Sequence, residues 1–317
     1  MEPLKGPRIF MEYKTVKEIS DLWGVSPAMI RKYCSQGRIP GAKRETGGWM
    51  IPSKSEKPEA ESTSPIKADN LHPLARKIRN QKNGRNFHGL YDYIQINAAY
   101  SSSRMASNRL TRNQVETIFR KGKVSDCFEP LKVSDLIEVM NHCVCMDHII
   151  DTIEQPLNVK YIKRLHEILM YGTVDDRLTQ VVPGELRNSK SRRKELFIGP
   201  AEEVNDRLIK LVKKYEALHE VERRDILDFH YQFECIFPFE DGNGRIGRLI
   251  MFKECLRHDV MPFILDDKKR AGYLDGLRNW KTDSSILSEV VIDSQERFNR
   301  QIERQILRAY GKEYEPK

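Results

Sequence analysis

Apolar residues recur at spacings of three and four along most of the chain after residue 70. This period predicts amphipathic helices, most clearly over residues 132–153, 159–171 and 204–219. In the first of these helices we expect one buried apolar face, formed by Leu136, Met140, Cys143, Val144 and Ile150. One run, residues 193–199, has the composition of a strand. Because strands and helices do not alternate, we expect a mainly α domain with at most one hairpin.

Two short helices are predicted near the start of the chain. Thr15 and Glu18 have the spacing of a capping box, which begins the first helix, and Gly24 ends it. Ser26 and Pro27 then suit the N-cap and the first position of a second helix. This pattern is typical of a helix-turn-helix.

The segment after these helices predicts a wing. Residues 38–52 form two short strands around a turn at Gly47 and Gly48. The order of elements resembles the winged helix-turn-helix of MerR and excisionase-type proteins, in which the second helix and the wing grip duplex DNA. The resemblance implies DNA contacts by Arg31 and Lys32 on the second helix and by Lys43 and Arg44 on the wing. A role in protein interaction or dimerisation is the alternative.

The distribution of charge indicates that a polyanion would bind near the same end of the chain. The protein carries a net charge of +8, and residues 1–53 hold nine Lys or Arg against five Asp or Glu. A surplus of this size also occurs on ordinary solvated surfaces. Charge therefore supports DNA binding without deciding it.

A boundary between two domains is visible in the composition. Residues 54–70 are rich in Pro, Ser, Glu and Lys and contain a single large apolar residue, Ile66, so they cannot build a core. We predict a small domain over residues 1–53, a linker over 54–70 and a larger domain over 71–317.

The composition limits the class of protein further. Of the 317 residues 39% are hydrophobic and 32% are charged, as in soluble globular proteins. No run approaches the roughly 18 uncharged apolar residues of a membrane span, and the first residues lack the apolar core of a signal peptide. We therefore expect a cytoplasmic protein without a membrane partner. The six cysteines lie mostly in predicted helices and should be reduced core residues. Cys143 and Cys145 lie about 200° apart on a helix, which disfavours a metal site there.

Residues 229–248 carry the clearest chemical signal, and they predict an anion site. A helix breaks at Pro238, a short loop with two glycines follows, and a new helix begins. Glycines let backbone N–H groups approach a phosphate, and the helix N-terminus adds its dipole. Arg245 and Arg248 lie on one face of the first turn and supply planar donor groups, while Asp241 is a hard oxygen ligand suited to Mg²⁺.

The stretch from Pro238 to Arg248 resembles the signature of the Fic (Fido) family, which reads His-Pro-Phe-x-Asp/Glu-Gly-Asn-Gly-Arg-x-x-Arg. The resemblance extends over about residues 87–300. It implies a helical Fic fold with a small β-hairpin flap, behind the winged domain. Family members typically transfer AMP from Mg-ATP to a hydroxyl of a target protein held against the flap.

The resemblance assigns roles to particular residues. Asp241 would hold Mg²⁺ on the phosphates, and Arg245 and Arg248 would contact the β- and γ-phosphates. Gly242, Asn243 and Gly244 would form the anion hole, and Tyr273 would line the ribose or adenine side. The flap that binds the target would comprise Arg193, Lys194, Glu195, Leu196, Phe197 and Ile198.

The sequence departs from the family pattern at two positions. Phe237 occupies the position of the catalytic His, and a phenyl ring cannot accept the proton of an attacking hydroxyl. His230, seven residues earlier, has a structural counterpart of its own in the family and is a poor substitute. In the family's inhibitory helix, which begins here at Ser102, Ala106 replaces the Glu that pairs with the second motif arginine. We therefore expect Arg248 to be free for a phosphate.

Three hypotheses follow. The first is an impaired Fic-type AMP transferase that retains a Mg-nucleotide site, for ATP or another nucleotide, and uses its winged domain on DNA or a partner. The second is an active transferase with altered nucleotide chemistry, and the third is a DNA-binding regulator with a structural Fic domain. The protein target is not defined by the sequence, and a homodimer is left open.

Overall fold

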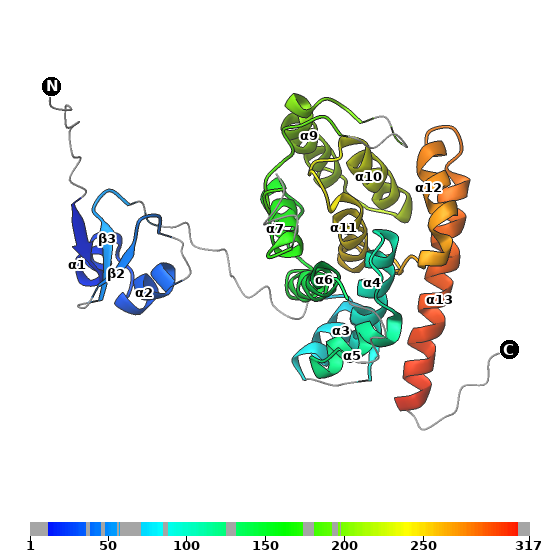
Figure 1. Ribbon diagram of the computed structural model, residues 1–317, viewed down its shortest axis with the longest axis horizontal. Coiled ribbons are helices and arrows are strands. Elements are labelled where there is room, and N and C mark those ends of the chain that lie inside the picture. The colour runs from blue at the N-terminus through cyan, green and yellow to red at the C-terminus, as the bar shows by residue number, and fades with distance from the viewer. Residues whose placement is uncertain are drawn as a thin grey trace. The chain divides into compact units, whose positions relative to one another are not determined.

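The computed structural model describes residues 12–35, 39–45, 48–55, 57, 71–84, 88–124, 131–173, 181–191, 196 and 198–309. The chain divides into two compact units, residues 1–66 and 67–317, and the division falls within the segment expected to be a linker. Figure 1 shows the helices and strands of both units. No helix among the described residues has the length and apolar character needed to cross a bilayer.

The small unit combines two helices with a three-stranded antiparallel sheet. Its elements are β1 (Tyr13–Thr15), α1 (Val16–Trp23), α2 (Pro27–Ser35), β2 (Lys43–Glu45) and β3 (Gly48–Pro52), and the strand order is β1-β3-β2. The capping box is present, because the Thr15 hydroxyl accepts the Glu18 N–H and the Glu18 carboxylate accepts the Thr15 N–H. Gly24 ends α1 in the left-handed conformation that glycine adopts most readily. The helix-turn-helix and the two strands of the wing are thus confirmed.

The sequence pattern missed strand β1. Its three residues pair with β3, with Lys14 opposite Ile51. So short a strand shows no alternation of its own, and it forms because β3 offers a free edge beside it. The core beneath the sheet contains Ile19, Ile30 and Ile51, all of which are fully buried.

The larger unit is built from helices. They are α3 (Pro73–Asn83), α4 (Leu90–Met105), α5 (Arg112–Lys121), α6 (Val133–Asp151), α7 (Val159–Met170), η2 (Ala201–Glu203), α9 (Val204–Glu216), α10 (Arg223–Ile236), α11 (Asn243–Arg257), η3 (Asp267–Lys269), α12 (Arg270–Asn279) and α13 (Ser285–Ala309). The three helices expected over residues 132–153, 159–171 and 204–219 are therefore confirmed as α6, α7 and α9.

Helix α11 lies at the centre of the larger unit and packs against α3, α4, α6, α7 and α10 (Figure 1). Twelve of its 15 residues are buried, including Lys253 and Glu254, which pair with each other at 2.7 Å. A helix buried all round has no apolar stripe, so its sequence does not show the period of a surface helix. The central position of α11 fixes the start of this helix rigidly in the molecule.

The face of α6 that is buried differs from the expected one. Met140 and Val144 are more than half exposed, whereas Val139, Cys145 and Ile149 are buried. The expected face was right for Ile150, which is fully buried, and wrong for Met140 and Val144. The difference arises because α6 buries polar residues on its inner side as well, among them Asp135 and His142. A helix that packs on two sides, against α4 and α7, does not reveal its inner face through apolar spacing alone.

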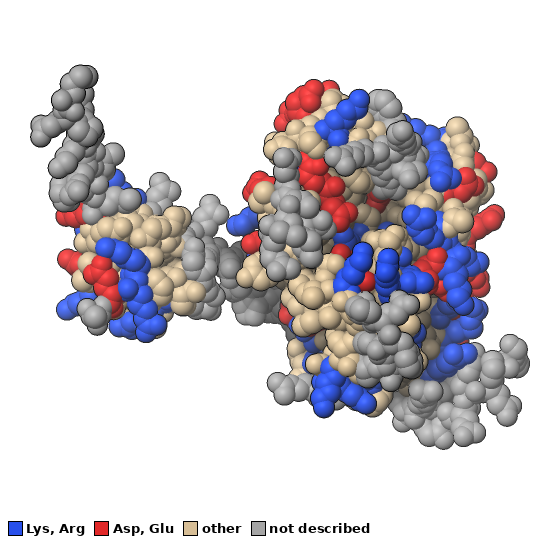
Figure 2. All heavy atoms as spheres, viewed as in Figure 1, with Lys and Arg blue, Asp and Glu red and all other residues tan. Residues whose placement is uncertain are grey.

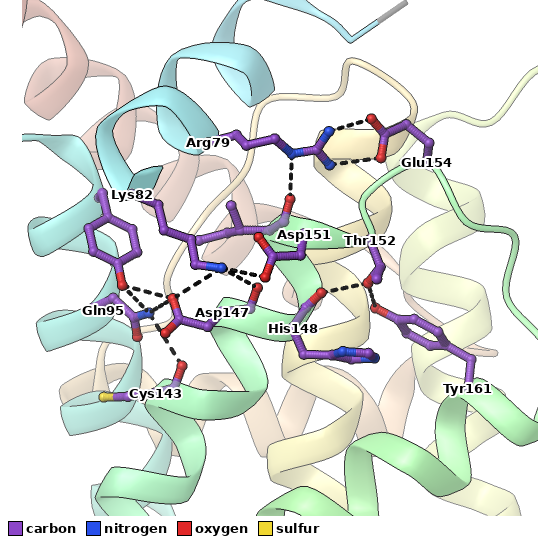
Figure 3. Close-up of polar contacts among 12 residues, drawn as sticks. Arg79, Lys82, Gln95, Cys143, Asp147, His148, Asp151, Thr152, Glu154 and Tyr161 are labelled. Atoms are coloured by element: carbon purple, nitrogen blue, oxygen red, sulfur yellow. Dashed lines mark hydrogen bonds and ion pairs between the residues drawn. The ribbon is translucent and has the colours of Figure 1, made fainter. Parts of the chain in front are cut away.

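Polar side chains on α3 and α4 bind the C-terminal end of α6 and the residues that follow it (Figure 3). Arg79 donates two hydrogen bonds to the carboxylate of Glu154, at 2.6 and 2.7 Å, and a third to the carbonyl of Ile150. Tyr91 and Gln95 on α4 both donate to Asp147 on α6. These contacts hold one end of α6, so that the other end is fixed beside the start of α11.

The predicted β-hairpin lies mostly outside the described residues. Arg193, Lys194, Glu195 and Phe197 are not described. Leu196 and Ile198 are described, and neither lies in a strand, although Leu196 packs on the core formed partly by Tyr273 and Leu277. Gly199 is also described and does not lie in a strand, so the strand expected over residues 193–199 is not found at these three positions.

Candidate functional site

The turn between α10 and α11 has a strained backbone held by a buried arginine. Phe237 ends α10 with φ of +51°, in the left-handed region that residues with a side chain rarely adopt. Arg187, only 3% exposed, donates from Nε to the carbonyl of Phe237 at 2.7 Å and from Nη2 to the carbonyls of Ile236 and Gly199. These bonds satisfy carbonyls that the helix end leaves without partners. Arg187 thereby fixes the position of Phe237.

The loop after Phe237 is closed by Asn243. Its side-chain oxygen accepts the Phe239 N–H at 2.9 Å, and its side-chain nitrogen donates to the Phe239 carbonyl at 2.7 Å. Gly242 precedes α11 with φ of +78°, and a Cβ there would lie 3.3 Å from the Met170 sulfur. The two hydrogen bonds of the Asn243 side chain therefore fix the shape of the loop. Because Asn243 begins α11, they also fix the position of the first N–H groups of that helix.

His166 on α7 anchors the same loop and was not singled out by the sequence. Its Nδ1 accepts the Gly184 N–H at 2.9 Å, which leaves the proton on Nε2, 3.2 Å from the Asp241 carbonyl. The ring stacks on Phe239 with centroids 3.8 Å apart. Burial lowers the pKa of His166 to about 4, so the ring is neutral at pH 7. A single histidine in an amphipathic helix gives no signal of this role.

An open pocket of about 440 Å³ lies at the start of α11, within the size range of small-ligand sites. Its lining comes from α4, α10, the loop, α11 and α12. The lining residues are Met105, Ala106, Glu234, Phe237, Asp241, Gly242, Asn243, Gly244, Arg245, Arg248, Arg270, Tyr273 and Leu274. The structure thus brings together Ala106, Phe237, Tyr273 and the predicted phosphate-binding residues.

Arg245 is a buried arginine with two carboxylate partners. It is 3% exposed; Nη1 lies 3.0 Å from Glu138 Oε2 and Nη2 lies 2.7 Å from Asp241 Oδ2. Burial raises the pKa of Glu138, and the positive charge of Arg245 opposes that rise. Glu138 comes from α6, nearly a hundred residues before the loop, and no sequence motif pointed to it. The Asp241 side chain is 52% exposed and faces solvent beside the pocket.

Arg248 has no carboxylate partner within the described residues, but it is held by neutral oxygens. Its Nε donates to the Ser102 hydroxyl and its Nη2 to the Ser102 carbonyl, each at 3.0 Å. The expectation considered only a carboxylate as partner and did not include the neutral oxygens at the end of α4. That Arg248 is free for a phosphate stays a prediction. Ala106 follows α4 and exposes only a methyl group to the pocket.

Tyr273 lines the pocket and is supported by His230. His230 Nε2 lies 2.6 Å from the Tyr273 hydroxyl, and both residues are buried. A Cβ on Gly247 would lie 2.6 Å from the His230 ring, so the close approach of α10 and α11 requires glycine there. His230 supports Tyr273 and is not among the residues that line the pocket, which agrees with its interpretation as a structural residue.

The residues predicted to contact DNA lie in the small unit. Arg31 on α2 and Arg44 on β2 are exposed, and the side chain of Lys32 lies outside the described part of the chain. Lys43 pairs with Glu45 at 2.7 Å and lies over the Tyr13 ring. Figure 2 shows basic side chains along this unit where β2 lies in Figure 1, and others in the larger unit over and beside α4 and α12.

Comparisons with known proteins find a match within each of the two units. Residues 156–255 match the Fic/DOC family, and residues 15–55 match a helix-turn-helix domain. The chain thus contains a Fic/DOC domain, matched over residues 156–255, and an N-terminal helix-turn-helix domain, matched over residues 15–55. Among curated proteins, none matches the sequence significantly.

Solved structures of Fic proteins share the fold. A Fic-domain signalling protein from Bacteroides thetaiotaomicron is 20% identical, with 79% of this chain and 95% of that chain covered and a TM-score of 0.59. A fragment of Fic-1 from C. elegans is 19% identical, with 72% and 70% covered and a TM-score of 0.58. A Fic family protein from Desulfovibrio desulfuricans is 19% identical, with 74% and 75% covered and a TM-score of 0.52.

Proposed function

We propose that the Fic domain binds a Mg-nucleotide, ATP first among the candidates, and is strongly impaired in transferring AMP to a protein hydroxyl. The observation that supports this proposal best is the pocket at the start of α11, where the glycine loop, Arg245 and Arg248 meet a phenyl ring. The residues that the Fic signature assigns to phosphate binding line this pocket together with Phe237, which stands at the signature's His position.

The phosphate groups would be bound by two kinds of donor. The first turn of α11 presents N–H groups that have no acceptor within the helix, and its dipole favours an anion. Arg248 adds a guanidinium, which donates to phosphate oxygens in a planar fork. Tyr273 closes the side of the pocket that is available to the nucleoside.

The residues present also fit a Mg²⁺ ion. Asp241 offers a half-exposed carboxylate at the pocket edge, and Mg²⁺ prefers one or two such oxygens together with phosphate oxygens and water. Mg²⁺ would neutralise the charge on the phosphates. Arg245 would remain held by Glu138 when Asp241 turns to the metal, because the two carboxylates contact different nitrogens.

Phe237 accounts for the proposed impairment. The residue lines the pocket and Arg187 fixes its backbone. In this proposal its ring replaces the base that would accept the proton. Removing a general base slows a reaction by about 10²- to 10⁴-fold. Mg-nucleotide binding does not depend on that proton transfer and should persist.

Titration calorimetry tests the nucleotide site. Mg-ATP should bind the wild-type protein, and Asp241→Asn should weaken binding in the presence of Mg²⁺ more than in EDTA. Glu240→Gln is the matched control, since Glu240 is the neighbouring carboxylate and does not line the pocket. Equal heats for all three proteins, or none for any of them, would contradict the proposal.

For the small unit we propose duplex DNA binding. It rests on the match to a helix-turn-helix domain together with the exposure of Arg31 on α2 and Arg44 on the wing. Affinity should fall steeply with salt, because phosphate contacts release counterions. In a gel-shift titration of the whole protein on mixed-sequence duplex, Arg31→Ala combined with Arg44→Ala should weaken binding at least tenfold and flatten the salt dependence. Unchanged binding would favour the alternative of a protein-interaction module.

A further inference from the structure

The two arginines of the pocket differ in how their charges are compensated. Arg245 contacts two carboxylates, those of Glu138 and Asp241. Arg248 contacts only the neutral hydroxyl and carbonyl oxygens of Ser102. Within the described residues, no carboxylate lies within 4.0 Å of the Arg248 guanidinium. The buried Glu234 carboxylate also lies beside Gly244, but no ion pair joins it to Arg248 in the described part of the chain. An incoming anion therefore meets a guanidinium that has no direct carboxylate partner.

The two contacts with Ser102 also fix the plane of that guanidinium. The Nε and Nη2 atoms are both engaged by one residue, as in a fork-shaped pair. The remaining nitrogen, Nη1, lies beside Gly244, where a Cβ would be only 3.0 Å away from it. The guanidinium thus presents its third nitrogen to the glycine loop.

Ser102 is well suited to hold the arginine in this position. It is 5% exposed and lies within α4, whose packing against α11 fixes its carbonyl and hydroxyl. Ala106, one turn after Ser102, lines the pocket at the start of α11 and carries no charged group that could pair with Arg248. Neutral acceptors orient a guanidinium without cancelling its charge, whereas a carboxylate would do both.

We propose that Ser102 is a positioning residue, which orients the Arg248 guanidinium toward the phosphate of a bound nucleotide. The positive charge of Arg248 thereby stays available to that phosphate. The inference rests on the proposed nucleotide site and names the contact that prepares it. Ser102 acts through Arg248, so its effect on binding should depend on that arginine.

A double-mutant cycle tests this dependence, with Mg-ATP and Mg-ADP as probes in titration calorimetry of the full-length protein. Ser102→Ala removes one of the two acceptors and should weaken binding about 3- to 10-fold. In the Arg248→Ala background the same substitution should change affinity less than twofold. Ser102→Thr, which keeps the hydroxyl, should restore affinity to within about twofold of wild type.

Ser103→Ala is the matched control, because Ser103 is a buried serine on the same helix that does not contact Arg248. It should leave affinity unchanged. Tighter binding by Ser102→Ala would show that Ser102 restrains Arg248 from the ligand, and equal weakening in both arginine backgrounds would show a merely structural role. Either result would overturn the inference while leaving the proposed function intact. Absence of binding by the wild-type protein would overturn the proposed function, and this inference with it.

Discussion

At the scale of single residues, the motif predicted which side chains gather but not how they are paired. The pocket does bring together Asp241, Arg245 and Arg248. Glu138 and Ser102, their partners, could not be predicted because contacts between distant helices leave no fixed spacing in the sequence. The same holds for Arg187, whose four carbonyl partners are backbone atoms without any residue signature.

Arg245 and Arg248 should therefore affect stability differently. Arg245→Ala leaves the buried Glu138 carboxylate without its cation and should lower the free energy of unfolding by about 3–5 kcal/mol. Arg248→Ala leaves only neutral oxygens of Ser102 without their donor and should cost about 1 kcal/mol. Urea unfolding of the two variants compares them directly. Equal losses would mean that Arg245 is not the structural member of the pair.

At the scale of elements, the sequence predicted helices with one exposed side better than those buried all round. Helices α1, α7 and α9 have clear apolar faces or caps. The inner face of α6 was misjudged because it buries His142 and Asp135, and β1 was missed because its partner strand creates it. The strand expected over residues 193–199 lies mostly outside the described residues, and Leu196, Ile198 and Gly199 do not lie in a strand.

The loop anchored to α7 should loosen in acid. His166 has a pKa of about 4 in the folded protein, against about 6.5 unfolded, so the unfolded state binds more protons between these values. Stability should fall as pH drops from 6.5 to 4 and level off below, with His166 contributing a loss of about 3 kcal/mol.

Across this pH range, the free energy of unfolding should depend less steeply on pH in His166→Gln than in wild type. The difference between the two slopes should correspond to about one bound proton. His219→Gln, at an exposed histidine, should keep the wild-type slope. A His166→Gln slope equal to that of wild type would mean that the buried ring does not control this transition.

At the scale of the whole molecule, the sequence predicted two units and the class of each. The low apolar content of residues 54–70 was sufficient to place a boundary, because a sequence with so few apolar residues cannot form a hydrophobic core. The Fic fold was predicted through a short motif, while the packing that makes α11 its centre appears only in three dimensions. Composition and periodicity alone would have given no more than a helical domain.

The central claim is that a nucleotide site persists where the catalytic base is absent. Incubation of the protein with α-labelled ATP, Mg²⁺ and cell lysate tests it, with wild type, Phe237→His and Phe237→His/Ala106→Glu side by side. We predict little or no labelled protein with wild type, strong labelling with Phe237→His, and suppression when the glutamate is added, since a carboxylate at position 106 could pair with Arg248. Labelling by wild type as strong as that by Phe237→His would contradict the account, as would a Phe237→His variant that binds Mg-ATP but labels nothing.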